Sequence, residues 1–324
     1  MASVDSWVEP VRTRRWVSVL ITSLFVFVLP GLGTLAALAS LVLGQATLFH
    51  LGLFILGFLA TGLGITVGYH RMLTHRSFET HPAIKAILLI MGSMAVEGPA
   101  NAWVANHLKH HLFSDQEGDP HSPRRGLFHS HWGWLSDFSD IDLERYGGRV
   151  QRDRISTWVS KTFALWVTAG YVIPFLIGGG LALANFGGTL AEGYPDAIRF
   201  LVGGGIGLAW GGLFRQLAVQ NVTFAVNSVC HRWGSRPFNT TDLSRNNWFV
   251  GLTGLGEGWH NNHHAFPASA FHGLRWWEFD LSGQVIQLLE SLRLAWNVRR
   301  PDLSQIQRKL FEPALATQYA RVTQ

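Results

Sequence analysis

Long apolar stretches alternate with polar segments along the chain. A helix needs roughly 20 apolar residues to cross a hydrocarbon core of about 30 Å. Four stretches reach that length, at about 16–43, 46–67, 157–183 and 198–217. A fifth run, Ala83 to Val96, is too short to span, and we expect it at the membrane interface or on the polar part. The pattern predicts an all-α integral membrane protein with four transmembrane helices.

Four crossings return both termini to one side of the membrane, together with the polar segments 70–156 and 226–324. Basic residues gather on that side, and seven of them lie between Arg124 and Lys161. The connection between the third and fourth spans is acidic instead. The positive-inside rule therefore predicts that both termini and the polar segments are cytoplasmic. We treat residues 1–324 as a single domain, in a bacterial inner membrane or its endoplasmic reticulum equivalent.

Composition supports the membrane assignment and removes one class of partner. Of the 324 residues, 48% are hydrophobic and only 15% are charged, which is unusual for a soluble protein. The formal net charge of +5 is compatible with nucleic-acid binding, but the basic residues flank the apolar runs. We therefore expect a lipid bilayer as partner and no nucleic acid. The single cysteine, Cys230, excludes a disulfide within the chain and a CxxC motif.

The chain has fifteen histidines, and three short motifs hold eight of them. The motifs HRMLTH, HLKHH and HNNHH contain, in turn, His70 and His75; His107, His110 and His111; and His260, His263 and His264. In the last two motifs, spacings of three and four residues put the imidazoles on one helix face, where they can converge on a common centre. His70 and His75 diverge by roughly 140° on a regular helix. We expect the helix to bend there and the two rings to serve different metal ions.

Three histidine motifs on one predicted side of the membrane indicate a metal centre. Eight ligands exceed the capacity of one first-row ion, about six at most, so two ions are implied. Imidazole accepts zinc, copper, iron or nickel. A structural zinc site closes with four ligands and usually recruits cysteine, and the sequence lacks the HExxH motif of zinc hydrolases. Redox iron is therefore the better assignment.

Other polar residues near the motifs have two interpretations. Asp115, Asp119 and Glu257 lie beside the motifs, where they either orient the ligand rings or are solvated loop acids. The histidines outside the motifs are interpreted as structural or surface residues: His50, His81, His121, His129, His131 and His272.

The three motifs resemble those of a known family. The stretches GITVGYHRMLTHRSFET, HLKHHLFSDQEGDPHSPRRG and GEGWHNNHHAFP are similar to the membrane-bound acyl desaturases, in particular their delta-9, stearoyl-CoA type branch. The match runs from Gly62 to Pro267. It implies a ninth histidine ligand, His231, and a metal-bound water held by Asn227, both in the stretch NSVCHRWG. The alternative interpretation of that pair is a polar helix end.

The resemblance implies a pair of iron ions as cofactor and O2 as co-substrate. Two external electrons reduce the irons, two hydrogens leave adjacent carbons of a saturated long acyl chain, and a cis alkene and water result. The sequence has no evident haem-binding or flavin-binding segment, so we expect a separate electron donor, a b-type cytochrome, ferredoxin or similar protein. The basic cytoplasmic face would help an acidic donor to dock.

The resemblance also suggests where the acyl chain lies. Trp103 and Thr223 match positions that line and hold the bend of the family's substrate tunnel, and ordinary helix packing is the alternative. Phe58 and Gly62 share a helix face at a spacing of four residues and match the closed end of the tunnel. Glu97 stands where animal relatives carry a glutamine.

The acyl carrier is less well defined. Ala105 and Asn106 replace an Arg-Asp pair that helps to bind coenzyme A in animal relatives, although Arg124 and Arg125 remain for phosphate contacts. Acyl-CoA is the first expectation and an acyl group on a membrane lipid is the second. A related di-iron membrane hydroxylase would share the motifs. A metal transporter would need ionisable residues within the spans, and almost none are evident.

Overall fold

The computed structural model describes residues 19–186, 193–312 and 318. It is mostly helical, and four helices are long and apolar enough to cross a membrane: Val19–Val42, Leu48–Thr74, Phe163–Leu183 and Asp196–Ser228. The all-α fold with four membrane helices is therefore confirmed. Residues 16–18 of the predicted first span lie outside the described residues.

Two spans differ from the prediction at their ends. The third helix begins at Phe163 and not at 157, because Thr157 belongs to a separate short helix, α8 (Arg154–Lys161). The fourth helix continues to Ser228 and not only to 217. Hydropathy marks where the apolar part of a helix ends, whereas the helix itself lasts as long as its backbone hydrogen bonds. The polar residues of the last turns are still helical.

The described chain divides into two compact units, which we describe separately. The first comprises Met1–Gly57, Leu135–Asp140 and Gly170–Leu217. The second comprises Phe58–Trp134, Ile141–Ala169 and Ala218–Gln324.

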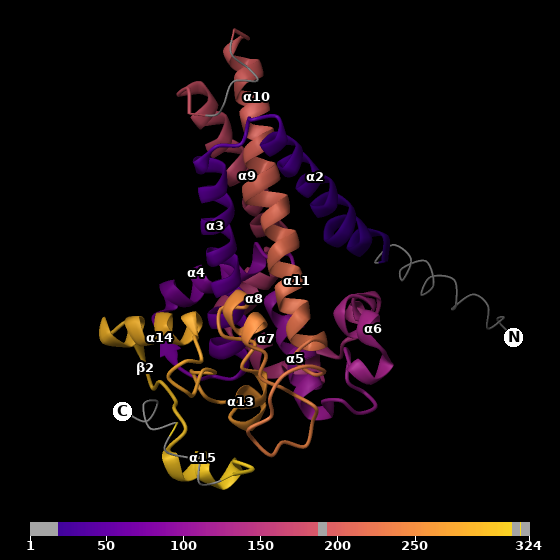
Figure 1. The fold of residues 1–324 in the computed structure, drawn as a ribbon, viewed down its shortest axis with the longest axis vertical. Coiled ribbons are helices and arrows are strands. Elements are labelled where there is room, and N and C mark those ends of the chain that lie inside the picture. The colour runs from indigo at the N-terminus through magenta and orange to yellow at the C-terminus, as the bar shows by residue number, and fades with distance from the viewer. Residues whose placement is uncertain (1–18, 187–192, 313–317, 319–324) are drawn as a thin grey trace, which may run out of the picture. The chain divides into compact units, whose positions relative to one another are not determined.

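The first unit consists of membrane helices that pack through small residues. It contains η1 (Leu24–Val28), α2 (Leu29–Val42), α10 (Asp196–Gly207) and η5 (Leu208–Phe214), with parts of α3 (Leu48–Leu63), α9 (Phe163–Leu183) and α11 (Arg215–Ser228). A side-chain carbon at Gly178 would lie 2.4 Å from the carbonyl oxygen of Gly203, so these backbones touch. Close backbone approach at small residues is typical of helix pairs in membranes. Figure 1 labels α2 and α10 of this unit.

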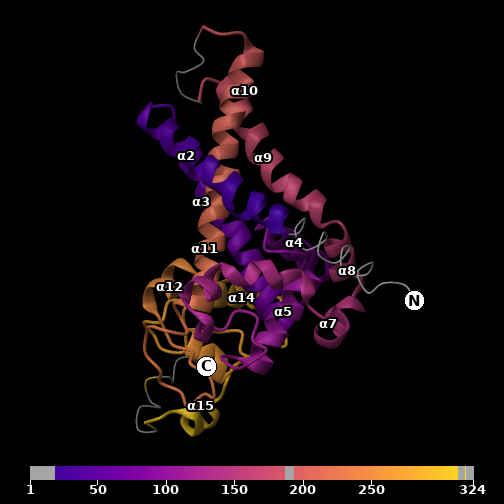
Figure 2. The same ribbon diagram turned by 90° about the vertical axis from the view of Figure 1, so that its right-hand side faces the viewer.

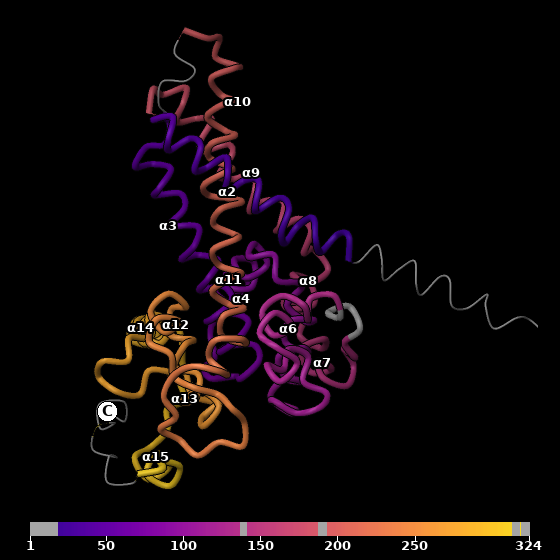
Figure 3. The backbone as a smooth tube through the Cα atoms, turned by 45° about the vertical axis from the view of Figure 1, so that its right-hand side comes forward, coloured from indigo at the N-terminus to yellow at the C-terminus, as the bar shows by residue number. Residues whose placement is uncertain are grey.

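The second unit holds all the histidine motifs. After the end of α3 come η2 (Gly64–Thr74), β1 (Glu79–Thr80), α4 (Pro82–Ser93), α5 (Ala100–Phe113), η3 (Pro123–Arg125), α6 (Leu127–His131), α7 (Leu143–Gln151) and α8. The helix η4 (Gly133–Asp140) follows α6 in the chain, but its residues from Leu135 on belong to the first unit. After α11 come α12 (Trp248–Thr253), α13 (His260–Ala265), α14 (Leu281–Ser291), β2 (Ala295–Trp296) and α15 (Leu303–Lys309), a course that Figure 3 traces. The two short strands pair antiparallel, with Glu79 opposite Trp296.

The core of this unit forms where α4 and α5 pack on η2 and where α7 and α8 pack on α5 (Figure 2). Every residue of η2 is buried. A side-chain carbon at Gly64 would lie 2.1 Å from the amide nitrogen of Gly92, so η2 and α4 are in backbone contact. The helix α4 has only 12 residues, as expected for a non-spanning segment, and it packs on η2 and α8 within the second unit.

Candidate metal centre and adjoining pocket

The structure brings the nine predicted histidine ligands together in two groups. The first cluster contains His70, His75, His107, His111 and His263, and the second cluster contains His110, His231, His260 and His264. Within each cluster the nearest ring nitrogens all lie within 4.8 Å of one another. The spacing argument holds only for residues four apart: His107 and His111 on α5 lie in one cluster, whereas His110, three residues after His107, lies in the other.

One expectation about the clusters is wrong. His70 and His75 were expected to serve different ions, but both lie in the first cluster. The reason is that η2 is a π-helix, in which the amide of His75 donates to the carbonyl of His70 over 3.1 Å. A bond between residues five apart brings them close to one full turn, so their rings share a face. Such π-helical segments are frequent at functional sites.

The rings converge through their Nε2 atoms. In the first cluster, the Nε2 atom of His263 lies 3.2 Å from that of His70 and 3.0 Å from that of His111. In the second cluster, the Nε2 atom of His260 lies 3.0 Å from those of His231 and His264. In each cluster the Nε2 atoms therefore converge on a common point, as the ligands of a metal ion do, and the two clusters form two such points.

In four of the rings the Nδ1 atom, on the other side of the ring from Nε2, contacts a carboxylate. Asp119 accepts from Nδ1 of His110 at 2.9 Å, Asp115 from Nδ1 of His231 at 2.9 Å, and Asp242 from Nδ1 of His264 at 2.8 Å; Glu257 pairs with Nδ1 of His70. Burial alone would raise the pKa of each carboxyl group, but the facing imidazoles lower that pKa below its ordinary value. Ionised carboxylates on Nδ1 leave Nε2 as the free donor atom for a metal.

The electrostatics of the histidines also fit metal ligation. Burial, reinforced by neighbouring imidazoles, holds the pKa values of five histidines well below the ordinary value: His75, His107, His111, His260 and His263. Burial lowers the pKa of His264 to about 4. The rings are therefore neutral near pH 7, and a metal ion binds the neutral form of imidazole. These donors suit a first-row transition metal.

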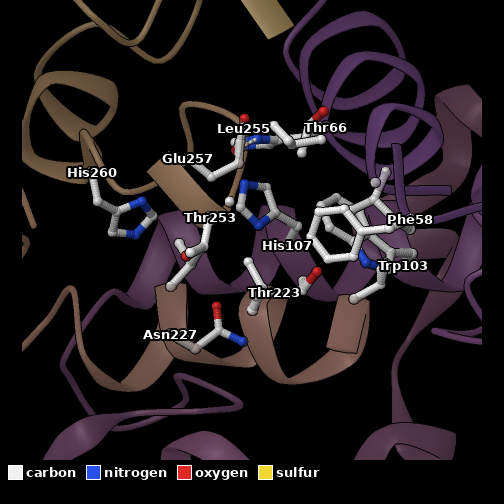
Figure 4. A pocket seen from close by; sticks show the side chains of 17 residues that line it. Phe58, Thr66, Trp103, His107, Thr223, Asn227, Thr253, Leu255, Glu257 and His260 are labelled. Carbon is white, nitrogen blue, oxygen red and sulfur yellow. Dashed lines mark hydrogen bonds and ion pairs between the residues drawn. The ribbon is translucent and has the colours of Figure 1, made fainter. Parts of the chain in front are cut away.

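A narrow, largely apolar pocket adjoins both clusters (Figure 4). His70 and His107 of the first cluster and His260 of the second line it, and Phe58 lies on its wall as well. The other lining residues are Gly62, Ile65, Thr66, Trp103, Val219, Val222, Thr223, Val226, Asn227, Thr253, Gly254, Leu255 and Glu257. The cavity has a volume of about 50 Å³.

The buried carboxyl group of Glu97 forms hydrogen bonds with two residues that line this pocket. The indole Nε1 of Trp103 donates to Glu97 at 3.2 Å, and Thr223 is a second hydrogen-bond partner of that carboxyl group. Glu97 is only 7% exposed, and burial raises its pKa to about 8. At neutral pH the group is therefore mostly the uncharged acid. A neutral acid resembles the glutamine amide expected at this position in relatives, because both carry a donor and an acceptor.

The comparisons with known proteins agree with these features. A family model described as fatty acid desaturase matches residues 46–285 of the chain. The chain belongs to the fatty acid desaturase family. Its histidine clusters and its four apolar helices that are long enough to span a membrane are consistent with that family. The match leaves out residues 1–45 and 286–324, which include most of α14 and all of β2 and α15.

Several relatives are similar over most of their length. A hex-5-enoyl-[acyl-carrier protein] acetylenase of Moorena producens is 36% identical over 87% of this chain and 87% of its own. An icosanoyl-CoA 5-desaturase of Limnanthes douglasii is 41% identical over 80% of this chain and 67% of its own. An sn-1 stearoyl-lipid 9-desaturase of Anabaena variabilis is 39% identical over 75% of this chain and 81% of its own. These relatives are named for three different acyl carriers.

The remaining predicted site residues of the desaturase fall in two places. Phe58, Gly62, Trp103, Thr223 and Asn227 all line the pocket. Arg124 and Arg125 lie in η3 and do not line it.

Sequence reasoning missed some residues around the clusters. His121 and His272 were interpreted as structural or surface residues, yet both are buried beside predicted ligands. The ring of His121 lies 4.3 Å from that of His110, and the ring of His272 lies 4.5 Å from that of His263. Asp242 was not considered, because it lies 22 residues before His264 in a loop. No spacing rule connects the two positions.

Proposed function

We propose that the protein is an O2-dependent acyl desaturase that introduces a cis double bond, at delta-9, into a saturated long-chain acyl-CoA. Two external electrons per turnover come from a separate donor, a b-type cytochrome, ferredoxin or similar protein. The observation that carries the proposal is the apolar pocket, which runs from Phe58 to histidines of both clusters. An acyl chain in it would expose its methylenes to the metal centre.

We also propose that both clusters hold iron. A bound di-iron centre would supply the oxidising chemistry that removes two hydrogens from unactivated carbons, which no side chain can do. The protein residues would have other tasks. The carboxylates fix the imidazoles, Trp103 and Thr223 hold the bend of the chain, and the apolar wall excludes water from the reacting carbons. Asn227 faces the pocket, where it would hold a water bound to the metal.

The chain is expected to be a single domain, 1–324, with both termini and the metal centre on the cytoplasmic side of a bacterial inner membrane or endoplasmic reticulum. The basic segments that flank the spans support this orientation. A reporter protein that works only in the cytoplasm should be active when it is fused after residue 324, and a reporter that works only on the opposite side of the membrane should be inactive there.

The first experiment tests the reaction itself. The full chain is expressed in a host that lacks its own desaturase, and the fatty acids are analysed for the position and geometry of new double bonds. We expect cis alkenes at delta-9. Hydroxy acids would identify a related hydroxylase, and triple bonds would favour the chemistry named for the Moorena producens relative. A variant with His110→Ala and His263→Ala should form no product.

Metal analysis tests the iron proposal. Purified protein reconstituted with ferrous iron should contain close to two irons per chain, because its nine histidines form two groups of ligands. A fully active protein with one iron per chain would contradict the proposal.

The acyl carrier needs its own experiment, since relatives are named for CoA, lipid and acyl-carrier-protein substrates. If Arg124 and Arg125 contact the phosphates of acyl-CoA, replacing both with alanine should raise the KM for acyl-CoA. The effect should weaken as the salt concentration rises. Unchanged acyl-CoA kinetics, with activity only on acyl groups of membrane lipids, would favour an acyl-lipid desaturase.

A further inference from the structure

A second cavity lies apart from the pocket and is strongly basic. Its volume is about 510 Å³, within the range of roughly 300–1,000 Å³ that is usual for small-ligand sites. Its lining residues are Met72, Leu73, Arg76, Phe78, Glu79, Thr80, Lys85, Arg149, Val150, Arg152, Asp153, Asn297 and Arg299. None of them lines the pocket beside the histidines. Five basic and two acidic residues leave a net charge of +3 on the walls.

Both acidic residues of this basic cavity already have partners. Asp153 pairs with Lys85 at 2.6 Å. Glu79 accepts hydrogen bonds from the Trp296 indole and the Asn297 amide, each at 3.1 Å. Among the described residues, the guanidinium groups of Arg76, Arg152 and Arg299 form no hydrogen bond with a carboxylate or a carbonyl. The positive charge is therefore only partly compensated from within the protein.

The arginines and the two acids of this cavity act on one another: Asp153 acts on Arg149, and Glu79 lies near Arg76 and Arg299. Arg149 donates to the carbonyls of Leu73 and Thr74, at 3.0 and 3.3 Å, which anchors its side chain at the end of η2. Burial and the nearby charge of Arg76 lower the pKa of Arg149. Arg76 itself has a φ of 52°, in the left-handed region that non-glycine residues seldom adopt. Such uncommon backbone conformations concentrate at ligand-binding and active sites.

The cavity lies where the chain enters and leaves the membrane. Arg76 follows the second span, which ends at Thr74, and Arg152 is eleven residues before the third span, which begins at Phe163. Lys85 lies on α4, whose Ile87 is 54% exposed. With the spans placed in a bilayer as proposed, Arg76 lies two residues beyond a membrane helix, near the level of the lipid headgroups.

We propose that this basic cavity is a binding site for a phosphate group, with the headgroup of an anionic phospholipid as its ligand. Arginine suits phosphate because its planar group donates two parallel hydrogen bonds to the oxygens. Arg76 and Arg299 contribute from two segments that the β1–β2 pairing holds together, since the amide of Arg299 donates to the Ser77 carbonyl at 2.8 Å. The site is independent of the proposed desaturation.

Binding of defined phosphate compounds tests this site. The full-length protein in neutral detergent is titrated with short-chain phosphatidylglycerol and with phosphatidylcholine, and separately with coenzyme A. The wild type should prefer phosphatidylglycerol, and Arg76→Gln with Arg299→Gln should weaken that binding at least about tenfold. Replacing Arg76→Gln by Arg76→Lys in this double variant keeps the positive charge at that position and should restore part of the phosphatidylglycerol binding. Arg308→Gln removes an exposed arginine on α15 and serves as the matched control.

Each outcome decides the proposal. Weaker binding of coenzyme A alone would keep the phosphate site and make a soluble compound its ligand. Equal binding of all compounds by the wild type and the double variant would overturn it. A defect limited to reduction by an acidic electron-transfer protein would also overturn it, in favour of a docking face. His110→Ala should leave phosphatidylglycerol binding unchanged, so a failure of the proposed reaction stays distinguishable.

Discussion

The Glu97 side chain is the clearest case in which burial of one residue sets its protonation state, and its carboxyl group also holds the Trp103 indole of the pocket wall. Its pKa is raised by burial from 4.5 to about 8, so between those pH values the folded protein holds a proton that the unfolded chain has released. Stability therefore falls as pH rises through this window. The Tyr69 and His70 rings of η2 and the His107 ring of α5 also surround the Trp103 indole that Glu97 contacts.

We predict that Glu97→Gln removes this loss of stability. Relative to wild type, the variant should gain on the order of a few kcal/mol between pH 6 and pH 9, because the amide has no charged form to desolvate. The melting temperature of both proteins across that range measures the effect. Glu144→Gln changes an exposed acid of α7 and should follow the wild type. Parallel curves for Glu97→Gln and wild type would show that Glu97 does not titrate there.

Asp242 acts on the second cluster through a single contact, so its role can be separated from that of the ligands. Asp242→Asn loses the ionised acceptor for Nδ1 of His264 and should weaken metal binding by about 10- to 100-fold. Iron retained per chain after dialysis against a graded chelator provides the measurement. The exposed Glu144→Gln variant again serves as the control. If Asp242→Asn retains iron as tightly as wild type, the carboxylate does not support the ring.

At the level of elements, the histidine motifs were predictable and the shape of η2 was not. Residues four apart on α5 and α13 share a cluster, as the spacing predicts, but His110 and His263, which were expected on the same face as their neighbours, lie in the opposite cluster. The pairing of His70 with His75 depends on π-helical hydrogen bonds, which carry no hydropathy signal. Contacts such as Asp242 with His264 join distant loops, and single-sequence patterns do not record them.

The packing of η2 on α4 provides a test at this level. Gly64→Ala would place a carbon 2.1 Å from the amide nitrogen of Gly92, and neither backbone can yield easily. We expect a loss of roughly 1–3 kcal/mol or more in stability, with displaced histidines. Gly52→Ala is the matched control, because a carbon there meets nothing within 4 Å. Thermal unfolding followed by the elution of folded protein in detergent compares them, and equal melting temperatures would contradict the packing argument.

For the whole molecule, the four spans and the polar unit could be predicted from hydropathy and charge, but the ends of the spans could not. The third helix starts later and the fourth ends later than the apolar runs suggest. This matters because the extension of the fourth helix carries Thr223 and Asn227 into the pocket. Hydropathy alone would have assigned them to a loop.

The position of the pocket relative to the spans makes chain length testable. Phe58 and Gly62 lie on its wall, and a carbon at Gly62 would lie 2.9 Å from the Leu255 side chain. We predict that Phe58→Ala shifts preference towards longer acyl chains, since in our proposal the Phe58 ring closes the end of the acyl-chain site. Gly62→Leu should shift it towards shorter chains. Competition between acyl substrates of graded length measures both, and unchanged profiles would place the end of the tunnel elsewhere.

The contacts of Arg71 also have a consequence for synthesis. This fully buried residue pairs with Glu257 and Asp280, which follow it by 186 and 209 residues. At roughly 5–20 residues per second, a ribosome needs about 10–40 s to make the chain between Arg71 and Glu257. During that interval η2 carries an uncompensated cation, whose burial is costly. The first histidine motif therefore cannot form its folded contacts until Glu257 has been made, and the centre closes only after the last motif has emerged.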